Sequence, residues 1–84
     1  MYNVYILKSQ NSGKYYIGSS ENPQRRLEFH NSIEKGFTSR YRPWEIVFNK
    51  EFSDIHTAQM IERKIKSWKS KIMIEKLLNG MVEL

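Results

Sequence analysis

The sequence of 84 residues contains no cysteine, which excludes disulfides and thiolate metal sites. It has only two prolines and four glycines, and no linker or low-complexity tract stands out. No apolar run is long enough to cross a membrane, and no basic start precedes an apolar stretch. We therefore expect neither a membrane span nor a signal peptide. The lack of cysteine fits a reducing compartment, and we expect the cytoplasm.

Acidic residues are also scarce, with nine Asp and Glu against fourteen Lys and Arg, and the formal net charge is +5. Many of the positive charges crowd between Arg63 and Lys71. A basic surface favours a polyanion, most simply nucleic acid, although a solubilising surface explains such a charge equally well. Charge alone therefore leaves both interpretations open.

Hydrophobic residues make up 39% of the chain and aromatic residues 13%, which is enough for a folded domain. A chain of this length buries about 60–65% of the surface that its unfolded state exposes. We therefore expect one domain over residues 1–84, with one modest core.

The first half of the chain predicts a hairpin and a helix. Residues 2–9 and 15–20 are rich in β-branched and aromatic residues and predict two strands, joined by a polar turn that contains Gly13. Asn22 can cap a helix that begins at Pro23 and runs to about Asn31. Because neighbouring residues of a strand face opposite ways, Tyr15 and Tyr16 should point to different faces of the sheet.

The second half predicts a loop, a strand and two helices. A basic, polar loop spans residues 32–43, and residues 44–52 predict the third strand. Ser53 or Asp54 can cap the next helix, and Ser70 a last helix that ends before Gly80. An apolar stripe at helical spacing consists of Ala58, Ile61, Ile65, Trp68 and Ile72. Residues 67–70 can interrupt the stripe, and Ile72 then lies on the last helix. We expect Ile61, Ile65 and Trp68 to pack on Ile6, Ile17 and Val47.

The order β-β-α-β-α-α is too irregular for a series of βαβ units. It predicts an α+β fold in which a small three-stranded sheet, mixed or antiparallel, is flanked by helices.

Two helical rows carry residues that could do chemistry. Arg26 and His30 stand four residues apart and share a helix face, and the guanidinium suits a phosphate. Glu62, Lys66 and Lys69 form a polar row beside the apolar stripe. Glu62 could hold a divalent metal through oxygen, or form a plain ion pair with Lys66, and the spacing favours the ion pair.

Taken singly, the remaining candidates have simple structural explanations. With two histidines and no thiol, the chain lacks the ligands of a zinc site, and His30 reads first as a hydrogen-bonded structural residue. Tyr5 and Tyr16 likewise read first as core aromatics.

Taken together, four motifs in this order point to one family. "NVY" (Asn3–Tyr5) is followed by "YIG" (Tyr16–Gly18), "RLEFH" (Arg26–His30) and "AQMIERKIKSW" (Ala58–Trp68). From Tyr2 to about Leu78 the chain resembles the GIY-YIG nuclease superfamily. It is most similar to the small stand-alone members, whose domain is similar to the N-terminal nuclease domain of a bacterial excinuclease. Asn3 stands where the family's first half-motif has a glycine.

The resemblance implies a metal-dependent endonuclease that hydrolyses phosphodiester bonds in DNA, with structure-specific cleavage in repair or recombination as a candidate role. Glu62 would ligate one Mg²⁺ or Mn²⁺ ion, and Arg26 would stabilise charge on the phosphoryl oxygens. Tyr5 is the expected general base, Tyr16 its orienting partner, and His30 a hydrogen-bonding residue of the site. We expect these five motif residues to converge on one shallow basic surface.

The expected nucleic-acid contacts come from basic residues outside the motifs and from the second helical row. They are Lys14, Arg25, Lys35, Arg40, Arg42, Lys66 and Lys69. The expected partner is DNA, with RNA open, and a second copy or another protein would supply specificity, because larger members carry a separate DNA-binding domain. The alternative is a basic nucleic-acid-binding module without catalysis, which would use Phe37 and Tyr41 for stacking.

Overall fold

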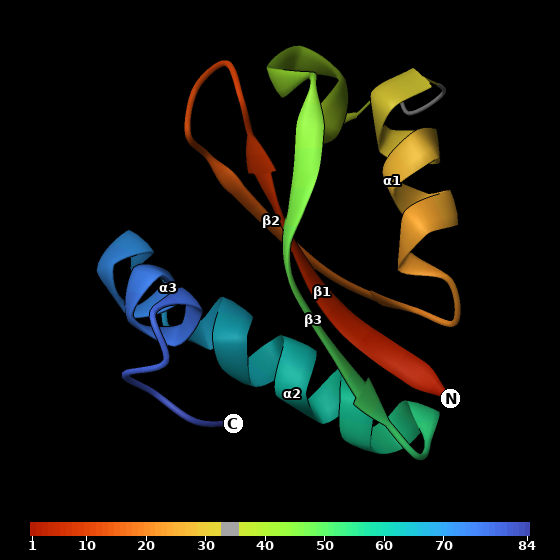
Figure 1. The fold of residues 1–84 in the computed structure, drawn as a ribbon, viewed down its shortest axis with the longest axis vertical. Helices are drawn as coiled ribbons and strands as arrows, with labels where there is room; N and C mark the ends of the chain where they lie inside the picture. The colour runs from red at the N-terminus through yellow and green to blue at the C-terminus, as the bar shows by residue number, and fades with distance from the viewer. Residues whose placement is uncertain (33–35) are drawn as a thin grey trace.

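Three antiparallel strands form the centre of the computed structural model, which describes residues 1–32 and 36–84. Helices lie on both faces of the sheet (Figure 1). In chain order the elements are β1 (Tyr2–Ser9), β2 (Tyr15–Ser20), α1 (Pro23–Ser32), the 3-10 helix η1 (Phe37–Tyr41), β3 (Trp44–Phe52), α2 (Ile55–Ser67) and α3 (Lys71–Leu78). The predicted α+β order is confirmed, with an antiparallel sheet.

The strand order is β2-β1-β3, so β1 is central and β2 is an edge strand. In the β1–β2 hairpin, Tyr5 stands opposite Gly18 and Leu7 opposite Tyr16. Residues directly opposite each other share a face of the sheet. The hairpin register therefore decides which side chains of β2 accompany Tyr5.

One face of the sheet carries the larger part of the core, under α2 and α3. Its buried members are Val4, Ile6, Ala58, Ile65, Ile74 and Leu77. Ile61 and Trp68 pack against this cluster together with Ile17 and Val47, as predicted, but Trp68 is only partly buried. Tyr15 also packs here.

The opposite face is covered by α1 and η1. Tyr5, Leu7 and Trp44 are buried on it, with Tyr16 and Leu27 packed against them. Tyr15 and Tyr16 therefore belong to different faces, as the strand period predicts.

The helix ends follow the predicted chemistry, with one error in the apolar stripe. The side chain of Asp54 accepts a hydrogen bond from the backbone of Thr57, and Ser70 does the same for Met73. Ile72 was expected in the apolar stripe and on the last helix, but its side chain is 65% exposed. The chain breaks between Ser67 and Lys71, so α3 starts with a new orientation and buries Ile74 and Leu77 instead.

The predicted loop at residues 32–43 is wrong in part, because α1 continues to Ser32 and η1 occupies Phe37–Tyr41. Lys35 lies outside the described residues. Among the helices that the structure describes, none is long and apolar enough to span a membrane.

We predict that Ile65→Ala lowers the free energy of unfolding by about 2–5 kcal/mol, because Ile65 is 1% exposed and its loss leaves a cavity. The matched control is Ile72→Ala, which removes the same atoms from a side chain that is 65% exposed. It should change the value by less than about 0.5 kcal/mol. Urea titration of both variants measures the difference, and equal losses would contradict the assigned core.

Candidate functional site

Tyr5 packs closely against Gly18 in the candidate site. They stand opposite each other on β1 and β2. A β-carbon added to Gly18 would lie 2.6 Å from Tyr5 Oη and 2.7 Å from Tyr5 Cζ. The phenol ring therefore lies against the backbone of the edge strand, where no side chain fits beside it. This contact explains why the second half-motif ends in glycine.

Helix α1 brings His30 to the hydroxyl of Tyr5. Asn22 Oδ1 accepts a hydrogen bond from the backbone N–H of Arg25 at 3.1 Å and fixes the start of the helix. His30 lies two turns further on, is 1% exposed, and has Nε2 3.4 Å from Tyr5 Oη. Arg42 Nε donates to the carbonyl oxygen of His30 at 2.8 Å. Burial and these contacts make His30 part of the framework that holds Tyr5.

Tyr16 completes an aromatic cluster on the same face. Its ring centroid lies 4.7 Å from that of His30 and 6.4 Å from that of Trp44. Unlike Tyr5, Tyr16 keeps part of its side chain exposed. Of the two motif tyrosines, Tyr16 is the one that a substrate can reach.

Burial raises the pKa of the Tyr5 phenol above its usual value, and the nearby charges modify this effect. A hydrogen bond from Arg26 lowers the pKa, whereas the proximity of Tyr16 and the negative charge of Glu62 raise it further. A general base needs a pKa closer to the working pH. The environment of Tyr5 therefore argues against its expected role as the base and suits a neutral phenol that donates or accepts hydrogen bonds.

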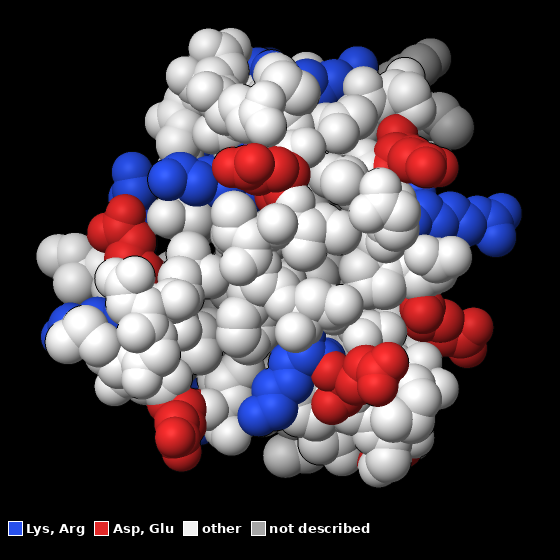
Figure 2. All heavy atoms as spheres, in the orientation of Figure 1, with Lys and Arg blue, Asp and Glu red and all other residues white. Residues whose placement is uncertain are grey.

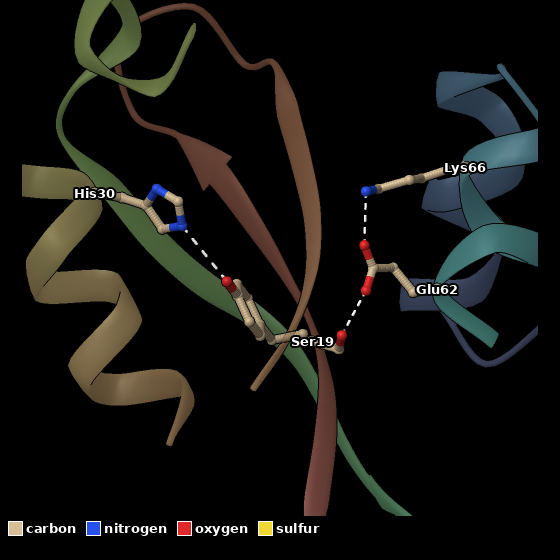
Figure 3. Close-up of polar contacts among 5 residues, drawn as sticks. Ser19, His30, Glu62 and Lys66 are labelled. Atoms are coloured by element: carbon tan, nitrogen blue, oxygen red, sulfur yellow. Dashed lines mark hydrogen bonds and ion pairs between the residues drawn. The ribbon is translucent and has the colours of Figure 1, made fainter. Parts of the chain in front are cut away.

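Glu62 approaches from the other face of the sheet. It lies on α2, and its carboxylate accepts hydrogen bonds from Ser19 Oγ and, at 2.6 Å, from Lys66 Nζ. Figure 3 shows His30 on α1 and the Ser19–Glu62–Lys66 chain on opposite sides of the sheet. Glu62 thus lies on the α2 side of the sheet, and the convergence of the five motif residues on one shallow basic surface stays a prediction.

The five motif residues instead surround the edge strand β2. Tyr5, Tyr16, Arg26 and His30 belong to the α1 side, and Glu62 belongs to the α2 side. In the described part of the chain no strand pairs with the outer edge of β2, so side chains from both faces can meet over that edge. The effect of the Glu62 charge on Tyr5 is consistent with this arrangement.

The donor atoms at Glu62 fit a hard divalent cation. The carboxylate and the Ser19 hydroxyl offer oxygen only, and the Glu62 side chain is 20% exposed, which leaves room for water. Mg²⁺ usually keeps several waters and takes one or two carboxylates from the protein. No cluster of three or more Asp, Glu, His or Cys that could cage a metal occurs in residues 1–32 and 36–84. A cation held here would depend on Glu62, Ser19, water and substrate oxygens.

The residues expected to contact nucleic acid differ in exposure. Lys and Arg alternate with Asp and Glu over the face of the molecule shown in Figure 2. Arg25 and Arg40 are exposed, whereas Arg42 is partly buried against α1. Lys14 Nζ lies 5.2 Å from the ring centroid of Tyr41, which itself packs on Trp44. The side chain of Phe37, the other predicted stacking residue, lies outside the described part of the chain.

Lys66 and Lys69 border a hollow between β2, α2 and α3, which also takes in Lys71. Sequence reasoning missed both Lys71 and Ser19. The strand period could have found Ser19, because it alternates with Ile17 on the side of β2 that faces α2. No comparable signal marks Lys71, because its place depends on the break between α2 and α3.

We predict that Tyr5→Phe removes part of the alkaline loss of stability. The folded-state pKa of Tyr5 is raised above the value of about 10 that an unfolded tyrosine has. The stability linked to Tyr5 is therefore fully present below about pH 10 and is lost as the pH rises through the folded-state pKa. Urea titrations from pH 8 to 11 should show a shallower decline for the variant.

The pKa of Tyr15 is also raised, by burial and by Glu75, and it adds the same slope to parent and variant. The difference between the two curves therefore reports Tyr5. Parallel curves would contradict the environment assigned to it.

Comparison with known proteins identifies a family and several similar proteins. The model of the GIY-YIG catalytic domain family matches residues 1–77. The structure-specific endonuclease subunit SLX1 of Phaeosphaeria nodorum is 48% identical over 50 residues, which cover 54% of this chain and 14% of that protein. The subunit slx1 of Pyrenophora tritici-repentis is 33% identical over 84 residues, covering 77% of this chain and 23% of that protein.

A solved structure shares the fold. The solution NMR structure of the UPF0213 protein from Bacillus halodurans has a TM-score of 0.60 and 28% identity, and the match covers 94% of this chain and 84% of that one. The chain spans less than a quarter of the length of the two fungal subunits. From the family match over residues 1–77 and the placement of its motifs around β2, the chain belongs to the GIY-YIG catalytic domain family.

Proposed function

We propose that this chain is a metal-dependent endonuclease that hydrolyses phosphodiester bonds in DNA. The observation that carries the proposal is the gathering of residues from four separate motifs around the edge strand β2, next to Gly18. Core packing alone does not require a buried histidine on the phenol, an arginine beside it and a carboxylate at the rim. The fungal relatives are named structure-specific endonuclease subunits, which supports a branched or flapped DNA as substrate.

The roles of the motif residues follow from their exposure and charge. Arg26 is partly exposed beside the Tyr5 hydroxyl and can bind the phosphoryl oxygens as they gain charge. Tyr16 is the better candidate for the residue that takes a proton from the attacking water, because Tyr5 is 1% exposed with a raised pKa. Tyr5 and His30 then position Arg26 and Tyr16 rather than meet the substrate.

Glu62 and Ser19 would hold the divalent cation, Mg²⁺ or Mn²⁺, which supplies Lewis-acid stabilisation of the phosphate when bound. Ser19 and Lys66 each engage one carboxylate oxygen of Glu62, and each oxygen keeps a second lone pair that could ligate the cation.

The Glu62–Lys66 ion pair also supports the alternative, a basic binding module without catalysis. A pair at this spacing stabilises many surface helices and needs no substrate to explain it. Its partial burial against Ser19 on the edge strand favours the enzyme, because a module that only binds phosphate gains nothing from a carboxylate there.

The fungal relatives are named as subunits, and the two compared here extend well beyond the matched region. We infer that this chain works with a protein partner or a second copy, which adds DNA-binding surface and selects the branched structure.

We predict that Glu62→Gln and Arg26→Ala each reduce single-turnover cleavage by roughly 10²-fold or more, because each removes a group that stabilises the transition state. The substrates are flaps, forks, hairpins and single strands, with Mg²⁺, Mn²⁺ or EDTA. The matched control is Glu51→Gln, which neutralises an exposed carboxylate on β3. It should cut as the parent does.

Two results decide against the proposal. If Glu62→Gln cleaves at the parental rate, the activity comes from another site or another protein. If no substrate is cut although binding is tight and salt-dependent, the binding module replaces the enzyme.

Arg40 and Arg42 should respond differently to the same replacement. Arg40→Gln removes an exposed charge, so binding should weaken for all sequences and the salt slope should fall by about one unit. Arg42→Gln removes the donor to the His30 carbonyl and should lower the unfolding free energy by about 0.5–1.5 kcal/mol. Anisotropy at several salt concentrations and thermal melts test the pair. If the Arg42 variant keeps the parental stability, the structural role of Arg42 is wrong and its predicted contact with DNA stands.

A further inference from the structure

A hollow of about 470 Å³ lies between the start of β2, the end of α2 and the start of α3. We define it by its floor, which consists of Tyr15, Ile17, Ile65 and Ile74, and by its rim, which includes Lys66, Lys69 and Lys71. The volume falls within the range of small-molecule sites. No acidic residue is among the described residues that line it. We call it the lysine hollow.

The floor of the lysine hollow is rigid and apolar. Ile65 is 1% exposed and Ile74 is 7% exposed, and both belong to the main core. Tyr15 packs on the same core and contributes an aromatic ring to the floor. A flat apolar group can therefore lie on this floor and displace only water.

The rim carries concentrated positive charge. A β-carbon built on Gly13 would lie 3.5 Å from Lys71 Nζ, which places this ammonium at the turn between β1 and β2. Among residues 1–32 and 36–84 the structure records one ion pair, and it engages Lys66 with Glu62. Lys69 and Lys71 thus present their charge to solvent and to whatever enters the hollow.

Lys69 stands in a backbone conformation that residues with a β-carbon rarely adopt, with φ of 46°. It directly follows the C-terminal cap of α2, a position where glycine is the common residue. Glycine would satisfy the backbone better, so a lysine here points to a use for its side chain at the rim.

The lysine hollow is continuous with the candidate site. Ser19, Ile17 and Tyr15 follow one another along the same side of β2, from the Glu62 contact to the floor. Along α2, Lys66 is one turn beyond Glu62, about 6 Å on the helix axis. The lysine hollow therefore begins one helical turn from the candidate metal ligand.

We propose that the lysine hollow binds one unpaired nucleotide of the substrate strand, near the phosphate at Glu62. The inference rests on the proposed function and adds its substrate class, a strand with a single-stranded segment next to the cleavage point. The base lies on the floor beside Tyr15, and Lys69 and Lys71 bind the flanking phosphates. Apolar or aromatic floors with cationic rims bind single strands in this way.

The first test uses binding without metal, so that no cleavage is needed. The probe is a thymidine hexanucleotide, followed by amide NMR shifts and by fluorescence anisotropy at several salt concentrations. The largest shifts should fall on Gly13, Ile17, Lys69 and Lys71. A hexamer of abasic sugars carries the same phosphates and should bind roughly tenfold more weakly. Inorganic phosphate at the same concentration should leave the floor amides unchanged.

The matched pair of variants separates local binding from net charge. Lys69→Gln/Lys71→Gln should weaken hexanucleotide binding at least tenfold and reduce the salt slope by about 1.4, the value for two phosphate contacts on a single strand. Lys64→Gln/Lys76→Gln removes the same charge from exposed positions of α2 and α3 outside the hollow and should have a much smaller effect.

Lys69→Gly tests whether binding weakens in a variant that still folds. Because glycine suits the backbone at this position, its melting temperature should equal or exceed that of the parent while hexanucleotide binding weakens. Equal weakening by both double variants, equal affinity for the abasic hexamer, or shifts confined to α1 would overturn the proposal.

The two proposals can fail separately. If the chain cuts no DNA but the hexanucleotide binds as described, the nuclease proposal fails and the lysine hollow stands as a strand-binding site. If Glu62→Gln abolishes cleavage while Lys69→Gln/Lys71→Gln cuts flaps with parental affinity and rate, the nuclease proposal stands and the hollow has no part in it.

Discussion

The close approach of the Tyr5 ring to the backbone of Gly18 is the contact on which the candidate site depends. It holds the phenol against the edge strand, and there His30 and Arg26 can reach its hydroxyl from α1. Any larger residue at position 18 would push the ring away and separate these partners. One glycine without a side chain thus sets the position of three functional groups.

The edge position of β2 explains why a site can form from two sides of the sheet. A central strand would keep the groups of α1 and those of α2 apart, because neighbouring strands would fill the space between them. β2 is the edge strand of the described sheet. Along it, Tyr16 and Gly18 face α1, whereas Ile17 and Ser19 face α2. Exposed edges invite pairing with other chains. Here functional side chains from both faces surround that edge.

The break between α2 and α3 forms the lysine hollow on the α2 side of the sheet. α2 ends at Ser67 and α3 begins at Lys71, so a short segment turns the chain while Ile65 and Ile74 stay in the core. The turn borders the lysine hollow and supplies one of its cations, Lys69, between Lys66 on α2 and Lys71 on α3. The same connection thus serves core packing and the strand binding that we propose.

Local sequence patterns were sufficient for most of the fold. Strand periods, caps at Asp54 and Ser70, and the stripe through Ile61 and Ile65 predicted the element order and the main core, because these features act within a few residues. Ile72 was misplaced, because the predicted interruption at residues 67–70 does not specify how α3 turns relative to α2. Motif order likewise identified the family but not the geometry of its residues.

The sequence by itself determined the elements, the family and the candidate residues for the chemistry, because each is written in local spacing or in motif order. Only the tertiary structure decided that Glu62 comes from the face opposite Tyr16, that Tyr5 is buried with a raised pKa, and that Ser19 donates to the carboxylate. Those facts depend on which strand forms the edge of the sheet and on how far each helix lies from it. Such distances arise from contacts between residues that are remote in the chain, and no local pattern records them.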